Sequence, residues 1–404
     1  MEHDPLLLIL AAGLLGFGLI SQRIERIALT APMLFLVLGI ISGPLLFNWS
    51  SPAIESTALK VIAELTLALI LFTDASQVQR SHLVKFENLP IRLLALGLPM
   101  TMILGGICAY LLFPGHWQVA VMIGIILAPT DAALAQSVFT ATAIKEKLRH
   151  SITVESGLND GLALPFLLLV IAIASAGSVD SVDPFYWTNF LLQQVALGAV
   201  IGIGVGHFGG YALETAARHE WMNPVFQRLS SVALALVTYT SAEHIGGNGF
   251  IAVFMAGLFL HAGRTIAVTR LKEFGEAEGQ LLTLIMFFLF GLIYVPDALP
   301  ELTTEVFCYA LLSLTVIRII PVLLALIGTD LMLKEKLFLG WFGPRGIASI
   351  LYLLLVVEQL GFSETLPGYD LLFPTVVTTV VLSIFIHGMS VPVWLRWLSS
   401  SDKR

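Results

Sequence analysis

The sequence predicts an all-α polytopic membrane protein with about thirteen transmembrane helices, and three observations support this. Of the 404 residues, 57% are hydrophobic and only 12% are charged, about half the charged fraction of an average soluble chain. The apolar residues gather in long runs separated by polar or Gly/Pro-rich loops. Basic residues occur almost entirely in alternate loops. We therefore expect one integral membrane domain over residues 1–404, with no sign of a nucleic-acid-binding region.

The apolar runs are long enough to cross a bilayer, with roughly 14–27 residues each against about 20 for a simple crossing. The eighth to tenth runs are the least regular, because they are short or rich in glycine. The first run lacks a preceding positively charged stretch, so we expect a retained span and not a signal peptide. The runs lie near 5–22, 29–47, 58–76, 89–113, 117–139, 151–176, 188–213, 229–243, 249–262, 280–295, 304–327, 337–359 and 370–395.

The charges orient these spans. With the N-terminus outside, all of the 21 basic residues lie on one side of the membrane except Lys60, Arg318 and Arg345. Lys60 is close to the start of the third span on the opposite side, and the two arginines fall within spans. Because basic residues favour the cytoplasmic side, we expect a cell inner membrane protein with its N-terminus outside and its C-terminus in the cytoplasm.

Two prolines indicate an internal repeat. Pro129 and Pro344 each interrupt a span near its middle, where proline removes a helical hydrogen bond and frees carbonyl groups. Their numbers differ by 215, and the same offset relates the span triplets 89–176 and 304–395. The two broken spans are an odd number of crossings apart, so they run in opposite directions. An inverted repeat with paired broken helices is typical of secondary transporters. We expect a core bundle over these triplets and scaffold helices over approximately 5–76 and 188–295.

One face of the sixth span carries the main candidate site. Glu155 and Asn159 are four residues apart, as are Ser156 and Asp160, so all four share one face of a helix. An ionisable residue inside a span marks an ion or proton pathway by default, and such hard oxygen ligands suit Na⁺, K⁺ or H⁺. Asp160 is the expected binding carboxylate, against the alternative of a hydrogen-bonded structural acid. Burial disfavours a charged carboxylate, so proton and cation should compete for it.

Residues near the breaks have more than one interpretation. Glu155 needs a buried positive partner; Arg318, in a span that we expect to be uninterrupted, is preferred, and Arg345 is the alternative. Asp131 is placed to neutralise helix N-termini at the crossing. Thr130 offers a hydroxyl and a freed carbonyl to a cation, or else it only caps a helix.

For several further polar or small residues, the sequence allows two roles each. Asp74 either lines the cavity or marks the cytoplasmic end of the third span, and Glu64 is either functional or structural. His244 is placed either as a pH sensor or as an inert helix-end residue. A stripe of glycines on the seventh span serves either a dimer contact or internal packing. It consists of Gly198, Gly202, Gly206 and Gly210.

These motifs together resemble the monovalent cation–proton antiporters of the Na⁺/H⁺ exchanger type, in the prokaryotic part of the cation:proton antiporter 1 group. The resemblance covers the whole chain, and its stretches occur in the family's order. They are Ala128–Asp131, Glu155–Gly161, Gly247–Val253 with Ala256–Leu258, Arg318 within Val316–Pro321, and Gly343–Gly346.

The resemblance implies a fold of core and dimer domains that works as a homodimer, without a cofactor. It implies Na⁺ ligation at Asp160, Ser156 and the Thr130 backbone, with Asn159 nearby in the Asn-Asp pair of the electroneutral branch. Asp74 stands where many members carry glutamate in Phe-Phe-Glu-Gly, whereas the local run here is Phe-Thr-Asp-Ala. Because the last span is expected to end near 395, no large cytoplasmic domain is expected after it.

The expected function is antiport of Na⁺, or of Li⁺ or K⁺, against H⁺, one for one, in sodium transport and pH homeostasis. A K⁺/H⁺ antiporter is the first alternative and differs only in selectivity. A channel is disfavoured by the paired broken helices. An intramembrane hydrolase is disfavoured because Ser156 has no histidine within its span, so we do not expect an enzyme.

The orientation is testable by cysteine labelling in a background that lacks both native cysteines. Single cysteines at Ser181 and Ser363 should react with an impermeant reagent from the outside, because both lie in loops expected there. A cysteine at Lys334 should react only after the membrane is permeabilised. Labelling of position 334 in intact cells would contradict the thirteen-span orientation.

Overall fold

The computed structural model describes residues 5–25, 29–45, 56–77, 88–131, 134, 144–176, 183–260, 266–360 and 368–399. Over this part of the chain the structure is all-helical, with no strand, as the sequence predicts. The elements are α1 (Pro5–Glu25), α2 (Ala31–Ile40), η1 (Ile41–Leu45), α3 (Ser56–Gln77), α5 (Asn88–Arg92), η2 (Leu93–Gly97), α6 (Leu98–Leu112), α7 (Trp117–Ile126), α9 (Glu146–Ala176), α10 (Pro184–Arg218), α11 (Pro224–His244), α12 (Gly249–Phe259), α13 (Ile266–Ala298), η4 (Leu299–Glu301), α14 (Thr304–Leu314), α15 (Val316–Ala325), α16 (Leu333–Trp341), α17 (Ile347–Leu360) and α18 (Tyr369–Ser399).

The helices have the length and composition of a membrane protein. Among the described residues, seven helical stretches are long and apolar enough to cross a bilayer, and four further apolar helices are shorter. Two of the shorter ones, α7 and α17, are parts of the predicted broken spans. As far as the described residues extend, each of the thirteen predicted spans coincides with a helix or with consecutive helical pieces. The second half of the fifth span, after the first break, lies largely outside the described residues.

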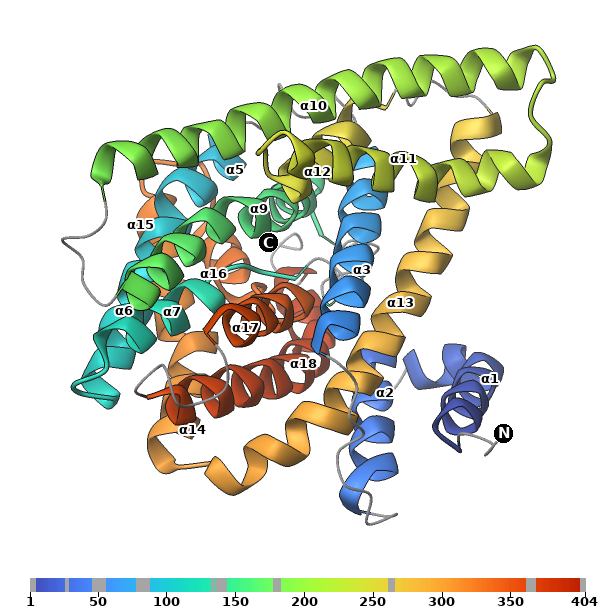
Figure 1. Ribbon diagram of the computed structural model, residues 1–404. Coiled ribbons are helices and arrows are strands. Elements are labelled where there is room, and N and C mark those ends of the chain that lie inside the picture. Colours follow the sequence, from blue (N-terminus) through green and yellow to red (C-terminus); the bar gives the residue numbers. More distant parts are fainter. Residues whose placement is uncertain are drawn as a thin grey trace.

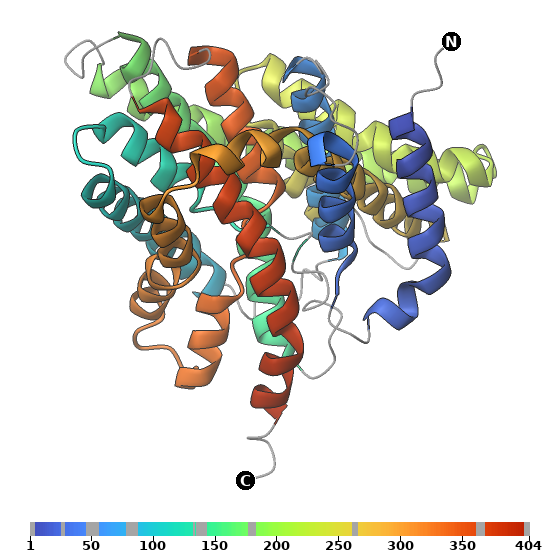
Figure 2. The same cartoon turned by 90° about the horizontal axis from the view of Figure 1, so that it is seen from below.

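The helices pack in two groups (Figure 1). In one group, α10 and α3 pack on α12, and α13 packs on α2, α3 and α11. In the other, α7 packs on α6, α9 and α18, while α14 packs on α18. Figure 2 shows α18 crossing the molecule obliquely toward the C-terminus. The groups meet where α9 and α17 contact α3 and where α9 contacts α12.

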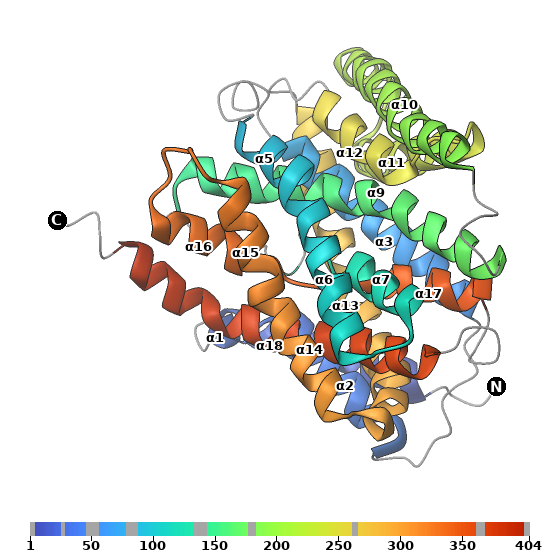
Figure 3. The same ribbon diagram turned by 90° about the vertical axis from the view of Figure 1, so that its left-hand side faces the viewer.

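The second group contains the predicted repeat. Figure 3 views it with α6, α14 and α15 toward the reader. The first triplet consists of η2 with α6, then α7 with its break, then α9; the second consists of α14 with α15, then α16 with its break and α17, then α18. The helices before the two breaks correspond closely, because α7 ends at Ile126 and α16 ends at Trp341, a difference of 215 (341 − 126).

The tenth span was expected to begin near 280, and the apolar, membrane-length stretch begins close to there, at Ala277. The helix α13 that contains it begins earlier, at Ile266, because charged residues such as Arg270 continue a helix as readily as apolar ones. One expectation is wrong. The eleventh span was expected to be uninterrupted, but Thr315 adopts φ −122° and ψ −91° between α14 and α15. Pro321 cannot donate to the carbonyl of Ile317, so the hydrogen-bond ladder is weak just beyond this break.

The glycine stripe of α10 packs inside the chain. A Cβ added at Gly198, Gly202 or Gly206 would lie 2.2–2.7 Å from main-chain oxygen atoms of Asn248, Ala252 or Ala256. These oxygens belong to α12 or to its N-cap residue. At these three positions the structure therefore favours internal packing over the dimer contact that the sequence left open. The absence of side chains lets the two helix backbones approach closely.

Gly202 provides a stability test of this packing. Gly202→Ala places a methyl group 2.2 Å from the Ala252 carbonyl oxygen, so α10 and α12 must move apart. We expect a loss of roughly 1–3 kcal/mol in the free energy of unfolding, measured by thermal or denaturant unfolding of the purified protein.

Gly204→Ala is the matched control, because nothing lies within 4 Å of its added Cβ. It should be neutral or stabilising by up to about 1 kcal/mol, since alanine favours the helix. Equal losses from both variants would contradict the close packing of α10 on α12.

Candidate functional site

The candidate ion residues lie on α9, a 31-residue helix with a glutamate in its first turn. Such an acid favours helix initiation because it complements the positive N-terminal dipole. The face predicted to carry the site is completely buried, with exposed fractions of 1% or less for Glu155, Ser156, Asn159 and Asp160. Polar groups buried to this extent need partners, and the surrounding helices supply most of them.

The two breaks meet beside this face. The main-chain N–H of Asp131, after the first break, donates to the carbonyl of Pro344 in the second break at 2.7 Å. The Arg345 guanidinium donates through Nη1 to the carbonyls of Ala128 at 2.9 Å and Pro129 at 3.0 Å. The structure thus brings together both predicted breaks, and the carbonyls that the first one frees are bound by a buried arginine.

Asp131 caps the helix that follows the second break. Its Oδ2 accepts the N–H of Ile347, the first residue of α17, at 2.5 Å. Its Oδ1 accepts the N–H of Leu134 at 3.3 Å. A carboxylate at this position complements the positive end of the α17 dipole, which is the geometry expected from the sequence.

Thr130 joins the crossing to α9. Its Oγ1 lies 2.9 Å from the Ser156 Oγ and accepts a hydrogen bond from the Asn159 Nδ2 at 2.8 Å. Asp160 is one helical turn after Ser156, and its Oδ1 has no hydrogen-bond partner among the described residues. A buried carboxylate oxygen without a donor, on the helix face that also carries the Ser156 hydroxyl, suits a proton or a small cation.

Glu155 pairs with Arg318. The Arg318 Nη2 lies 2.5 Å from the Glu155 Oε1, and both side chains are 1% exposed. The pair joins α9 to α15, and it is the preferred one of the two pairings considered from the sequence. Arg345 binds main-chain carbonyls instead. Arg318 itself lies just after the break at Thr315, and not within an unbroken helix as expected.

The remaining candidates lie on other helices than α9 and the two crossing segments. Asp74 is buried near the end of α3, beside Ala75, which packs with residues of α12. Its part in ion binding stays a prediction. His244 is exposed at the end of α11, and Glu64 lies 3.9 Å from the Lys60 Nζ, which also pairs with Glu358 of α17 at 2.7 Å.

Three contributors were missed from the sequence. The Tyr352 hydroxyl of α17 donates to the main-chain carbonyl of Asp160. Ser383 of α18 accepts the N–H of Arg345 at 2.7 Å and contacts the ring of His387. Polar residues in apolar helices are a usable signal, but their partners are set by helix packing that no local pattern reveals.

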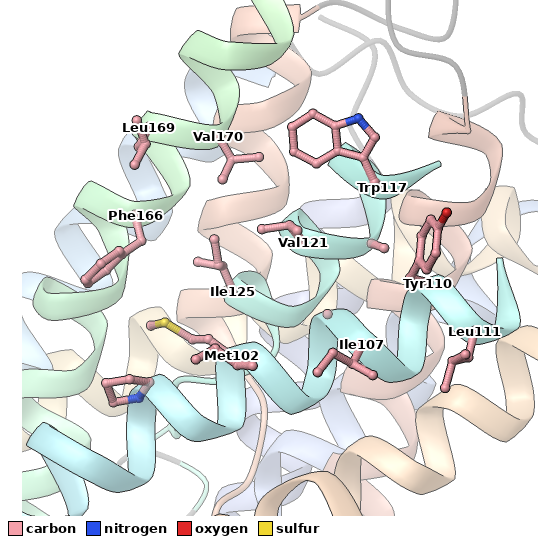
Figure 4. A pocket seen from close by; sticks show the side chains of 14 residues that line it. Met102, Ile107, Tyr110, Leu111, Trp117, Val121, Ile125, Phe166, Leu169 and Val170 are labelled. Atoms are coloured by element: carbon pink, nitrogen blue, oxygen red, sulfur yellow. The ribbon is translucent and has the colours of Figure 1, made fainter. Parts of the chain in front are cut away.

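An open groove elsewhere is not an ion site. It has a volume of about 560 Å³ and lies between α6, α7 and α9 (Figure 4). Its lining includes Met102, Ile107, Trp117, Phe166 and Val170 and is almost entirely apolar. Such a surface suits hydrocarbon and offers a cation no replacement for its water.

The site combines a buried carboxylate and two hydroxyl groups with a pair of broken helices, and comparison with known proteins gives the family. The family profile described as "Sodium/hydrogen exchanger, transmembrane" matches residues 7–397. The chain therefore belongs to the sodium/hydrogen exchanger family.

Relatives bear different substrate names. The chain is 28% identical over 394 residues to the K(+)/H(+) antiporter NhaP of Alkalimonas amylolytica, covering 94% of this chain and 64% of that protein. It is 26% identical over 425 residues to Na(+)/H(+) antiporter 2 of Zygosaccharomyces rouxii, covering 95% of this chain and 52% of that protein. The chain thus spans less than two thirds of the length of these relatives.

The fold is also found among solved structures. The sodium proton antiporter MjNhaP1 from Methanocaldococcus jannaschii superposes with a TM-score of 0.80 at 22% sequence identity. The match covers 99% of this chain and 100% of that one. This likeness shows a shared fold.

The Glu155–Arg318 pair is testable by a double-mutant cycle. Glu155→Ala and Arg318→Ala should each lower the free energy of unfolding by about 3–5 kcal/mol, because each leaves a buried charge without its partner. The double variant should lose less than the sum of the two. Unfolding of the purified protein in detergent gives all four values.

Glu214→Ala is the control, because it removes a pair between Glu214 and Arg218 on the α10 surface. It should change stability by about 0.5 kcal/mol or less. Strictly additive losses at positions 155 and 318 would show that the two residues are not coupled.

Proposed function

We propose that the protein is a secondary active antiporter that exchanges a monovalent cation for H⁺ across the membrane. The observation that carries this proposal is the buried Asp160 carboxylate. Its Oδ1 has no donor among the described residues, and it lies one turn from a serine bonded to the crossing. One carboxylate that takes either a cation or a proton is sufficient for exchange, and no covalent chemistry, enzyme activity or cofactor is required.

The charges around the site favour one-for-one exchange. Glu155, Asp131 and Asp160 are buried with Arg318 and Arg345, so this group carries one net negative charge when its residues are ionised. One bound proton or one bound monovalent cation neutralises it. Moving a net charge through an apolar environment is costly, so the loaded site should cross the membrane more readily than the empty one. Asn159, where a second acid would add charge, is consistent with electroneutral exchange.

Na⁺ is the preferred substrate, with Asp160, Ser156 and Thr130 as its ligands, and Asn159 holding the threonine hydroxyl. Li⁺ would use the same oxygens. K⁺ is the second candidate, because a relative of this chain is named a K(+)/H(+) antiporter. Hydroxyl and carboxylate oxygens suit all three ions, so selectivity depends on the size of the site.

The cellular setting is also part of the proposal. We place the chain in a bacterial-type inner membrane with its N-terminus outside, as the basic residues indicate, and surrounded by lipid. We propose a homodimer in which the repeat-containing group of helices moves against the scaffold of α1–α3 and α10–α13. Close packing of α10 on α12 supports a rigid scaffold.

Asp160→Asn tests the site. It removes the only charge that alternates between proton and cation, so cation-driven proton flux in proteoliposomes should be abolished while the protein remains folded. Flux is followed with a pH-sensitive dye after additions of Na⁺, Li⁺ and K⁺. Ser156→Ala is the milder comparison and should raise the apparent KM for the cation. Normal exchange by Asp160→Asn would make this residue structural.

Membrane voltage and pH test the coupling. Under one-for-one exchange no net charge moves, so imposed K⁺/valinomycin potentials should leave the rate and end-point of Na⁺-driven exchange unchanged. Lowering the pH should raise the apparent KM for the cation, because each proton bound at Asp160 excludes a cation. A systematic voltage dependence would indicate a second titrating group, and Asp131 and Asp74 would be the first to replace.

A further inference from the structure

The turn that bears Asp160 has a gap in its own hydrogen bonding. Pro165 lies within α9 and has no N–H to donate to the carbonyl of Gly161, four residues earlier. Gly161 directly follows Asp160 in the chain. In a membrane, a carbonyl released in this way needs another donor within the protein.

Asn248 supplies that donor from the other group of helices. Its Nδ2 donates to the Gly161 carbonyl at 3.1 Å, and its Oδ1 accepts the N–H of Ile251 at 3.0 Å. The orientation of the amide is fixed, because only its oxygen can accept an N–H and only its nitrogen can donate to a carbonyl.

Asn248 is itself held rigidly. It is 0% exposed, and it is the N-cap of α12. Its main-chain N–H donates to the Gln194 carbonyl of α10 at 3.0 Å. A Cβ added at Gly161 would lie 2.4 Å from Ile251 Cγ1 and 3.0 Å from the Asn248 Oδ1, so only glycine lets α9 approach α12 this closely.

We propose that Asn248 is a positioning residue for the ion site, which fixes the Asp160 turn by hydrogen-bonding the carbonyl that Pro165 releases. This inference rests on the proposed antiport function. It assigns Asn248 a role in holding the ion site without making it a ligand of the ion. Tyr352 holds the neighbouring carbonyl of Asp160 from α17, so the turn is held from both sides. The Tyr352 bond lies within the repeat-containing group, whereas the Asn248 bond joins that group to α12 and must break when the site moves against the scaffold.

The test is a double-mutant cycle of Asn248→Ser and Pro165→Ala, which compares four proteins: the wild type, each single variant and the double variant. Serine is as good an N-cap as asparagine, but its side chain is too short to reach the Gly161 carbonyl. Alanine at 165 restores a main-chain N–H four residues after Gly161. Asn248→Ser should raise the apparent KM for Na⁺ roughly threefold to tenfold, the worth of one hydrogen bond, and Pro165→Ala in the same chain should return it to the wild-type value.

Asn223→Ser is the matched control, because Asn223 caps α11 through its Oδ1 and is exposed. It should leave KM unchanged. The idea is overturned when Asn248→Ser has the wild-type KM, or when adding Pro165→Ala does not lower the raised KM.

A measurement without transport separates this inference from the proposed function. Thermal unfolding of the same four proteins should show coupling, with Asn248→Ser destabilising the wild-type chain more than the Pro165→Ala chain. Wild-type protein that performs no exchange but shows this coupling would overturn antiport while leaving the hydrogen bond in place. Active wild-type protein without coupling in either KM or unfolding would overturn the positioning role alone.

Discussion

The structure depends on one constraint: main-chain groups that leave a helix in the middle of a membrane must be bonded within the protein. At the two breaks, residues of each break bond the main-chain groups that are free in the other. The carbonyls released at Ala128 and Pro129 are bound by Arg345, and the first N–H of α17 is bound by Asp131. Because Arg345 and Asp131 make these bonds, one positive and one negative side chain are buried in the core of the molecule.

Those charges determine what surrounds them. Beside the arginine and the aspartate that are buried at the crossing, any further buried ionised group is costly unless an opposite charge neutralises it. Glu155 and Arg318 satisfy this by pairing with each other. Asp160 has no such partner among the described residues, so a proton or a cation is the remaining means of neutralising it. The crossing thus makes an alternating occupant of Asp160 physically reasonable, and it also brings Thr130 into hydrogen-bond contact with Ser156 and Asn159 of α9.

Much of this was predictable from the sequence. The spans follow from apolar runs, the pairing of breaks from two prolines with a common offset, and the buried polar face of α9 from a four-residue spacing on a helix. The preferred Glu155–Arg318 pairing followed from the scarcity of buried basic residues. The break at Thr315 was not predictable, because threonine is tolerated in helices and only the tertiary setting fixes its dihedral angles. The role of Arg345 depends on carbonyls 216 and 217 positions away, which no local pattern identifies. Asn248 was visible only as part of a motif, since its partner Gly161 lies 87 positions away.

The central claim is that one carboxylate, Asp160, is shared between proton and cation, and counting protons released on cation binding tests it most directly. Purified protein in weakly buffered detergent solution, near the pH at which the proton and cation forms are balanced, is titrated with NaCl or KCl against a choline chloride control. The account predicts that protons are released in step with cation binding, up to one for each cation that displaces a proton, and that Asp160→Asn releases none. Cation binding without proton release at any pH, or undiminished release from Asp160→Asn, would contradict it.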